Sequence, residues 1–286
     1  MSVEKYRLEY SEIGEWSEAK LDIIREYGHA YSTIMSAPNR SYLRHSYIDA
    51  FAGSGTHVSR ATGEFVSGSP VNALNVAPPF EEYFFIDRNR ETIRALETAV
   101  GARPNVHIYE GDSNDLLLRE VYPRLRYENY RRALCLLDPY GLDLRWDVIQ
   151  EAGHMRSIEI FLNFPIHDMN RNVFLLDTTK MDDRQIARMD TFWGDRSWRP
   201  IMYATQEHLF GTEEIKIGSN DDIAAAFRER LRNVANFSYV PEPVVMRNST
   251  RAMLYYLFFA SQNNTGERIV NDIFDKYRPK LDPRLF

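Results

Sequence analysis

The sequence predicts a doubly wound α/β fold, in which helices cover both faces of a mainly parallel sheet. Short apolar runs alternate with amphipathic stretches at helical spacing through residues 46–164. Two later apolar runs, 239–246 and 252–260, are joined by a bridge too short for a parallel crossover. We therefore expect seven strands, with one antiparallel strand near the end of the sheet.

Each element follows from its local pattern. Residues 16–36 carry apolar side chains three and four apart and end at Ala37-Pro38-Asn39, which predicts a helix that docks ahead of the first strand. Its charged residues are expected to face solvent: Glu15, Glu18, Lys20, Asp22 and Arg25. Further strands are expected at 46–51, 83–87, 105–109, 133–137 and 158–163, and further helices at 70–76, 89–100, 116–122, 146–155, 221–234 and 265–277. A hairpin centred on Thr62-Gly63 would delay the first crossover helix.

The chain divides into three parts by this pattern. Residues 1–45 form an N-terminal helical extension, and residues 46–164 with 221–286 form the doubly wound domain. Between them, residues 165–220 break the alternation into short polar and aromatic pieces such as Phe192-Trp193-Gly194. We interpret this segment as an inserted cap.

Composition excludes several classes of protein. A net charge of -6 over 286 residues disfavours a protein that coats nucleic acid through bulk electrostatics. The sequence has no apolar run long enough to span a membrane, and Met1 to Tyr10 lacks the features of a secretory signal, so we expect a cytoplasmic protein. The single cysteine, Cys135, permits no internal disulfide and is predicted to be buried. The seven histidines lack ligand spacing, so no structural metal is predicted.

Four acidic residues follow four successive predicted strands: Asp49, Asp87, Asp112 and Asp138. Because the carboxyl ends of parallel strands meet at one edge of a sheet, these acids should surround one crevice. Asp49 precedes a turn with Gly53 and Gly55, where glycine lets the backbone approach a ligand. We expect Asp87 to bind the hydroxyls of a ribose, Asp112 with Ser113 to reach an exocyclic amine, and Asp138 to face the reaction centre.

An NAD-dependent dehydrogenase is the alternative for such a turn. Here Val58 stands where that class would have a third glycine or alanine, and the delayed helix offers no nearby N-terminus to a pyrophosphate. Asp49 would also repel phosphates. A zwitterionic ligand with a cationic amino group, such as S-adenosylmethionine, fits these residues better than NAD.

Asp49 to Thr56 resembles the cofactor motif of the amino-methyltransferase branch of class I S-adenosylmethionine-dependent methyltransferases, in which the phenylalanine lies against the cofactor. Asp138-Pro139-Tyr140-Gly141 is similar to the Asp/Asn-Pro-Pro-Tyr/Phe motif of nucleic-acid amino-methyltransferases, and closer to the Asp-Pro-Phe-Gly variant of some tRNA guanine-N2 methyltransferases. The resemblance implies a Rossmann-like methyltransferase sheet and two sets of site residues. The cofactor-binding set is Asp49, Phe51, Gly53, Gly55, Asp87, Arg88, Asp112 and Ser113, and the catalytic set is Asp138, Pro139 and Tyr140.

The catalytic set has a chemical rationale. A carboxylate and the carbonyl of Pro139 can accept hydrogen bonds from a planar amine, while an aromatic ring stacks on the base. Because the motif lacks its second proline, Tyr140 lies one residue nearer to Asp138 than in the longer motif. The alternative interpretation is that Pro139-Tyr140-Gly141 only turns the chain after a strand.

A second resemblance covers nearly the whole chain. The residues that carry it are the leading helix, Tyr47 to Thr56, Gly68-Ser69-Pro70, Phe85-Ile86-Asp87, Asp138 to Gly141, Phe161 to Phe164, Phe192-Trp193-Gly194 and Leu257 to Ser261. They are similar to the three-Cys-motif partner family, whose members pair with a three-cysteine protein of the kind associated with an iron-sulfur cluster. The resemblance implies such a partner, which would have to supply the cluster because this chain has one cysteine.

Two basic, tyrosine-containing stretches, 39–45 and 119–132, suit an RNA or DNA substrate or are simply solvated surface.

Two functions follow from these patterns. The first is S-adenosylmethionine-dependent methylation of an exocyclic amine, with a nucleic-acid base as the acceptor. The second is a catalytically silent adaptor for the three-cysteine partner.

Overall fold

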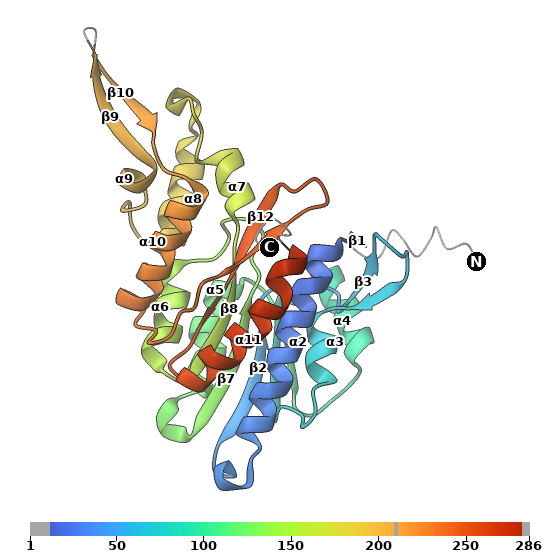
Figure 1. The fold of residues 1–286 in the computed structure, drawn as a ribbon. Coiled ribbons are helices and arrows are strands. Elements are labelled where there is room, and N and C mark those ends of the chain that lie inside the picture. The colour runs from blue at the N-terminus through green and yellow to red at the C-terminus, as the bar shows by residue number, and fades with distance from the viewer. Residues whose placement is uncertain (1–11, 209–210, 282–286) are drawn as a thin grey trace.

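A seven-stranded sheet forms the centre of the protein (Figure 1). The computed structural model describes residues 12–208 and 211–281. Along the sheet the strands are β11 (Val244–Arg247), β12 (Met253–Ala260), β8 (Ile158–Phe164), β7 (Arg131–Leu137), β2 (Arg44–Asp49), β5 (Glu82–Asp87) and β6 (Val106–Glu110). Strand β12 is antiparallel to both of its neighbours, and β8, β7, β2, β5 and β6 pair in parallel. The predicted mainly parallel sheet with one antiparallel strand is therefore confirmed.

Helices cover both faces of this sheet, as a doubly wound fold requires (Figure 1). One face packs against α2 (Glu15–Met35), α3 (Ser69–Leu74), α4 (Arg90–Val100) and α11 (Asn264–Leu281). The other packs against the short helix α5 (Ser113–Leu116) with its continuation Leu117–Val121, and against α6 (Trp146–Met155) and α10 (Asn220–Asn233). Within the described residues, no helix is long and apolar enough to span a membrane.

Strand β11 begins later than the sequence pattern indicates. Pro241 and Pro243 have no backbone N–H to contribute to a ladder, so only Tyr239 pairs before them, in an isolated bridge with Ser261. The regular strand starts at Val244 and lies at the edge of the sheet, where the prolines placed it.

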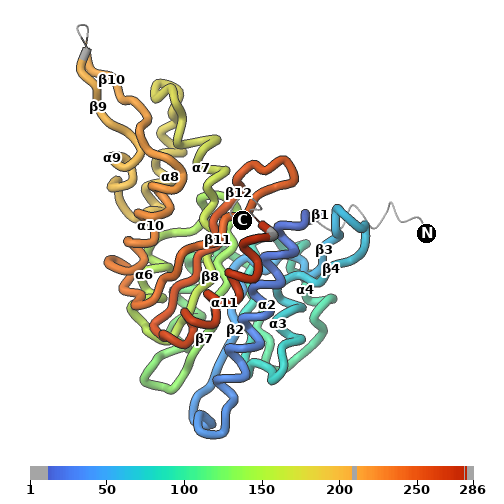
Figure 2. Tube along the Cα trace, in the orientation of Figure 1, coloured from blue at the N-terminus to red at the C-terminus, as the bar shows by residue number. Residues whose placement is uncertain are grey.

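The segment between β8 and α10 is more regular than expected. It contains α7 (Ile166–Asn172), a single turn at Thr178–Lys180, α8 (Asp183–Trp193), α9 (Arg199–Met202) and the hairpin β9 (Tyr203–His208) and β10 (Gly211–Lys216). Phe192 and Trp193 are buried in the same core as Phe227 of α10. The hairpin projects from the body of the molecule (Figure 2). Its assignment to a cap remains a prediction.

A small second sheet lies beside the glycine turn. The predicted hairpin around Thr62-Gly63 is present as β3 (Thr56–Ser59) and β4 (Phe65–Ser67), and Gly63 adopts a φ of +74°. Strand β1 (Glu12–Ile13) pairs in parallel with β3. The chain just before α2 therefore lies against the turn that follows β2.

Two helical glycines make a matched test of the packing. A Cβ at Gly153 of α6 would lie 1.8 Å from the carbonyl oxygen of Ala235, whereas a Cβ at Gly28 of α2 would meet Val76 at an ordinary 3.6 Å. We expect Gly153→Ala to lower the free energy of unfolding by about 1–3 kcal/mol through overpacking. Gly28→Ala should leave it unchanged or raise it by up to about 1 kcal/mol, because alanine is the better helix former. Urea denaturation measures both, and equal effects of the two substitutions would contradict the packing described here.

Candidate active site

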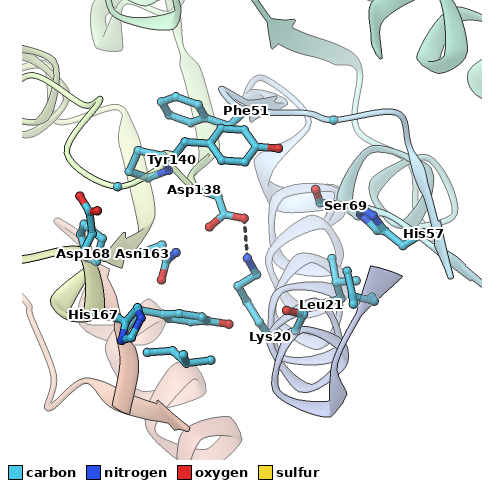
Figure 3. A pocket seen from close by; sticks show the side chains of 18 of the residues that line it. Lys20, Leu21, Phe51, His57, Ser69, Asp138, Tyr140, Asn163, His167 and Asp168 are labelled. Atoms are coloured by element: carbon cyan, nitrogen blue, oxygen red, sulfur yellow. Dashed lines mark hydrogen bonds and ion pairs between the residues drawn. The ribbon is translucent and has the colours of Figure 1, made fainter. Parts of the chain in front are cut away.

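A cleft of about 490 Å³ opens at the carboxyl ends of the central strands (Figure 3). Its walls come from the glycine turn after β2, the turn after β7, the first half of α2, the segment after β8 and the start of β12. The lining includes Ser17, Lys20, Phe51, Gly53, His57, Asp138, Pro139, Tyr140, Asn163, His167, Asp168 and Tyr255. Among the predicted site residues, the structure therefore brings together Phe51, Gly53 and the whole catalytic set.

Asp138 forms an ion pair with Lys20 in the wall of the cleft (Figure 3). Lys20 is only 8% exposed, so its expected place on the solvated face of α2 is wrong. The helix packs against the sheet with this residue turned toward the strand ends, where a carboxylate compensates its burial. Burial lowers the pKa of the Lys20 ammonium, but the charges of Asp138, Tyr255 and Asp49 outweigh it, and the net pKa is raised.

Asp49 is fully buried close to this ion pair. Its Oδ1 accepts a hydrogen bond from the backbone N of Phe51 at 3.4 Å, and the Ser69 hydroxyl lies close enough to act on the carboxyl as a hydrogen-bond donor. Burial raises the pKa of Asp49 to about 7, with the charge of Asp138 adding to the shift and Ser69 and Lys20 opposing it. A buried acceptor of this kind is typical of a functional site.

The open part of the cleft is aromatic. Tyr140 is 76% exposed, and its ring and that of Phe51 both line the cleft (Figure 3). Pro139, which lies between Asp138 and Tyr140 in the chain, is buried. The Tyr140 ring is therefore free to stack on a flat ligand that enters the cleft.

Gly53 and Asp87 connect the ends of two neighbouring strands. The backbone N of Gly53, with a φ of +63°, donates to Asp87 Oδ2 at 3.1 Å, and Asp87 Oδ1 accepts from the backbone N of Asn89 at 2.8 Å. Gly55 also has a positive φ, +77°, and is buried below the turn. Asp87 and Gly55 stand behind the cleft surface and do not line it.

The remaining predicted cofactor residues lie outside the cleft lining. Asp112 caps α5 by accepting from the backbone N of Asn114 at 2.9 Å, and the Ser113 hydroxyl donates to the carbonyl of Ala50. Arg88 lies 3.6 Å from Asp112 and 3.7 Å from Asp143. These contacts hold the ends of β5 and β6 and the turn after β7 together, and a cofactor role for the three residues stays a prediction.

The sequence reasoning missed three polar residues of the cleft: Asn163, His167 and Asp168. Asn163 Oδ1 and Asp168 Oδ2 are buried without a hydrogen-bond partner among the described residues. Asn163 lies at the carboxyl end of β8 and could have been found by the rule that identified the four acids. Asp168 is one reason why position 141 requires glycine, because a Cβ there would lie 2.4 Å from Asp168 Oδ2. The other reason is the positive φ of Gly141, +58°.

The residues described contain no group of three or more histidine, cysteine, aspartate or glutamate side chains placed to hold a metal ion. Cys135 is buried in β7, as predicted.

Comparison with known proteins bears on the fold. Neither the protein-family models nor the curated proteins that were searched contain a match. Among solved structures, a DUF519-family protein from Legionella pneumophila is 11% identical with a TM-score of 0.52, over 92% of this chain and 93% of that one. At this identity the similarity concerns the fold alone, and it agrees with the doubly wound sheet described above.

Other solved structures that match include proteins named as S-adenosylmethionine-dependent methyltransferases. One from Leishmania major is 10% identical, over 84% of this chain and 72% of that one, with a TM-score of 0.38. Another, from Methanosarcina mazei, is 13% identical, over 79% and 97% of the two chains, with a TM-score of 0.37.

The ion pair between Lys20 and Asp138 should show strong energetic coupling. Asp138→Asn leaves the buried Lys20 ammonium uncompensated and Lys20→Met leaves a half-buried carboxylate, so we expect each to lower the free energy of unfolding by about 1–4 kcal/mol. The double variant should lose less than the sum of the two. The exposed pair Asp22 and Arg25 on the same helix is the control, and its coupling should stay below about 0.5 kcal/mol. Additive effects of Lys20→Met and Asp138→Asn would contradict a buried pair.

Asp49 should make stability depend on pH. Its pKa is raised to about 7 in the folded protein, against about 4 when unfolded, so the folded state binds more protons between these values. The free energy of unfolding should therefore fall as pH rises from about 4 to about 7. Asp49→Asn should reduce this fall by about 1–4 kcal/mol, since one pKa unit corresponds to about 1.4 kcal/mol. Denaturation at several pH values tests this, and an unchanged slope would refute it.

Proposed function

We propose that this chain is an S-adenosylmethionine-dependent methyltransferase that acts on an amine nitrogen. The observation that supports this most is the meeting of two sequence motifs in one cleft of about 490 Å³. The turn with Phe51 and Gly53 stands against Asp138 and Tyr140 there, although the motifs are far apart in the sequence. The volume lies within the usual range of small-molecule sites.

The charged groups in and behind the cleft suit a zwitterionic cofactor. S-adenosylmethionine carries an amino-acid group with one positive and one negative end, and the site offers the Lys20 ammonium and the Asp49 and Asp138 carboxylates. The Asp49 carboxyl lies buried behind the lining, where its negative charge would favour a cationic amine in the cleft. We assign Asp49, Phe51 and Gly53 to the cofactor side of the cleft, with Asp87 holding the glycine turn in place.

The turn after β7 would position the acceptor. When bound, the cofactor supplies a methyl group to the amine nitrogen, and S-adenosylhomocysteine and one proton are the other products. The Asp138 carboxylate and the Pro139 carbonyl accept hydrogen bonds from the amine and orient its lone pair. Lys20 has to give up its contact with Asp138 for this to happen. The exposed ring of Tyr140 stacks on the acceptor and excludes water.

We propose an exocyclic amine of a nucleic-acid base as the acceptor. A flat ring with an amino group matches both the Asp138 carboxylate and the Tyr140 ring, and a base flipped out of RNA or DNA presents both. The resemblance to the three-Cys-motif partner family adds a partner protein that carries an iron-sulfur cluster. The single cysteine of this chain is buried and leaves the cluster ligands to that partner.

A catalytically silent adaptor for the three-cysteine protein is the second candidate. The ion pair of Lys20 with Asp138 favours it, because the carboxylate that would bind the amine already has a buried cationic partner. In that case the pair is a structural contact between α2 and the sheet.

Calorimetry with S-adenosylhomocysteine on ligand-free protein tests the cofactor assignment. We expect saturable binding below about 1 mM, consistent with a well-formed polar cleft of this size. Asp138→Ala should keep this binding and lose at least about 100-fold in methyl transfer to RNA, DNA or small amines, because it removes the amine acceptor. Asp138→Asn serves as a second variant if the alanine variant is unstable.

The outcomes separate the two candidates. If S-adenosylhomocysteine does not bind at millimolar concentration, the cofactor assignment is wrong. If the three-cysteine protein loses its activity when this chain is removed, but keeps it with Asp138→Ala, the adaptor is correct and the methyltransferase is not.

A further inference from the structure

A second cavity, of about 240 Å³, lies at the opposite edge of the sheet, near the amino ends of β7 and β8. Its walls come from the second half of α2, the loop before β7, the turn before β8 and the first residues of α11. The lining residues used below are Tyr31, Tyr127, Arg132, Arg156, Glu159 and Asn264. The loops before β2 and β7 meet at this end of the molecule, where Tyr42 and Tyr130 are in edge contact with ring centroids 5.6 Å apart.

Two arginines contribute positive charge to this cavity. The Arg132 guanidinium stacks on the Tyr127 ring at 3.6 Å and donates to the carbonyl of Arg131 at 2.6 Å, and Arg156 lies 5.9 Å from the same ring. Neither arginine has a carboxylate within ion-pair distance in the part of the chain that the structure describes. Their charge is therefore available to an anion.

A buried hydroxyl is a second and independent sign of a ligand. Tyr31 is 4% exposed and lines the cavity, and its hydroxyl has no hydrogen-bond partner among the described residues. Arg132 and Glu159 are close enough to act on it electrostatically. A buried phenol without a partner costs free energy unless a ligand or water accepts its hydrogen bond.

The remaining polar groups of the cavity do not oppose an anion strongly. Both oxygens of Glu159 accept hydrogen bonds, from the hydroxyls of Tyr27 and Ser261, which disperse the charge of the carboxylate. Asn264 begins the 18-residue helix α11, whose N-terminal end carries a partial positive charge.

We propose that this cavity binds a small phosphate-bearing molecule, held by Arg132, Arg156 and the Tyr31 hydroxyl. Arginine forks match phosphate oxygens in geometry and charge, and the volume admits a phosphate group with a small substituent. The surrounding surface argues for a compact ligand over a nucleic acid. Arg124 and Arg131 of the basic stretch 119–132 are paired with Glu82, which reduces the positive charge that this stretch offers to a nucleic-acid backbone.

The site is separate from the cleft proposed for methyl transfer. The cleft is at the carboxyl ends of the strands and contains Lys20, whereas this cavity is at their amino ends. Phosphate binding in this cavity therefore does not depend on the methyltransferase assignment.

Calorimetry of the full chain with inorganic phosphate, with adenosine monophosphate and with a short single-stranded RNA tests the proposal. We expect saturable binding of phosphate or adenosine monophosphate. Arg156→Gln should weaken it at least about tenfold, since Arg156 is exposed and its loss removes a charge-assisted hydrogen bond without disturbing the core. Tyr31→Phe should weaken it about three- to tenfold while the melting temperature stays the same or rises, because only the unpartnered hydroxyl is lost.

Two control variants make the assignment specific. Arg126→Gln removes an exposed arginine of the same stretch that does not line the cavity, and Lys20→Met removes the cation of the other cleft. Both should bind phosphate within about twofold of the unsubstituted protein, because neither residue lines the cavity. The proposal is overturned if neither small anion binds saturably, if Arg126→Gln or Lys20→Met weakens binding as much as Arg156→Gln, or if only the RNA depends on Arg156.

Discussion

The ion pair between Lys20 and Asp138 is the contact on which the candidate active site depends. It joins residues 118 positions apart, one on the helix that precedes the sheet and one in the turn after β7. The buried Lys20 charge is tolerated because the half-buried Asp138 carboxylate compensates it, so this pair helps to fix α2 against the strand ends. Helix α2 is consequently a wall of the cleft, although its position before the first strand suggests a separate extension.

The four acids at the strand ends have four different environments. Asp138 is paired with a cation, and Asp49 is buried. The Asp87 carboxylate accepts a hydrogen bond from the backbone N of Gly53, and Asp112 caps a helix. The parallel sheet brings them to one edge because all four follow strands that run in the same direction. Their position is thus a consequence of the topology, and their chemistry is set by the neighbours that each one meets.

Local patterns in the sequence predicted the seven strands of the central sheet and the turn after β7, because buried parallel strands are apolar runs that end at polar residues. The role of Lys20 could not be predicted in this way. A lysine in an amphipathic helix usually faces solvent, and its partner is remote in the sequence. The hairpin of β9 and β10 was missed for another reason, since residues such as Thr212 and Glu213 are exposed and leave no apolar alternation to detect. Asn163 differs from these missed features, because its position at the carboxyl end of β8 follows from the same strand pattern that identified the four acids.

Helix α2 also connects the two cavities. Lys20 contributes to the cleft and Tyr31 to the cavity at the opposite edge, and eleven residues make three helical turns, so both side chains lie on the same face. Between them Ile23, Ile24 and Tyr27 are buried against the sheet and against α11. A helix packed along this whole length behaves as one rigid element. The buried residues between the two sites therefore hold Tyr31 beside the cavity even when the contact of Lys20 with Asp138 is lost.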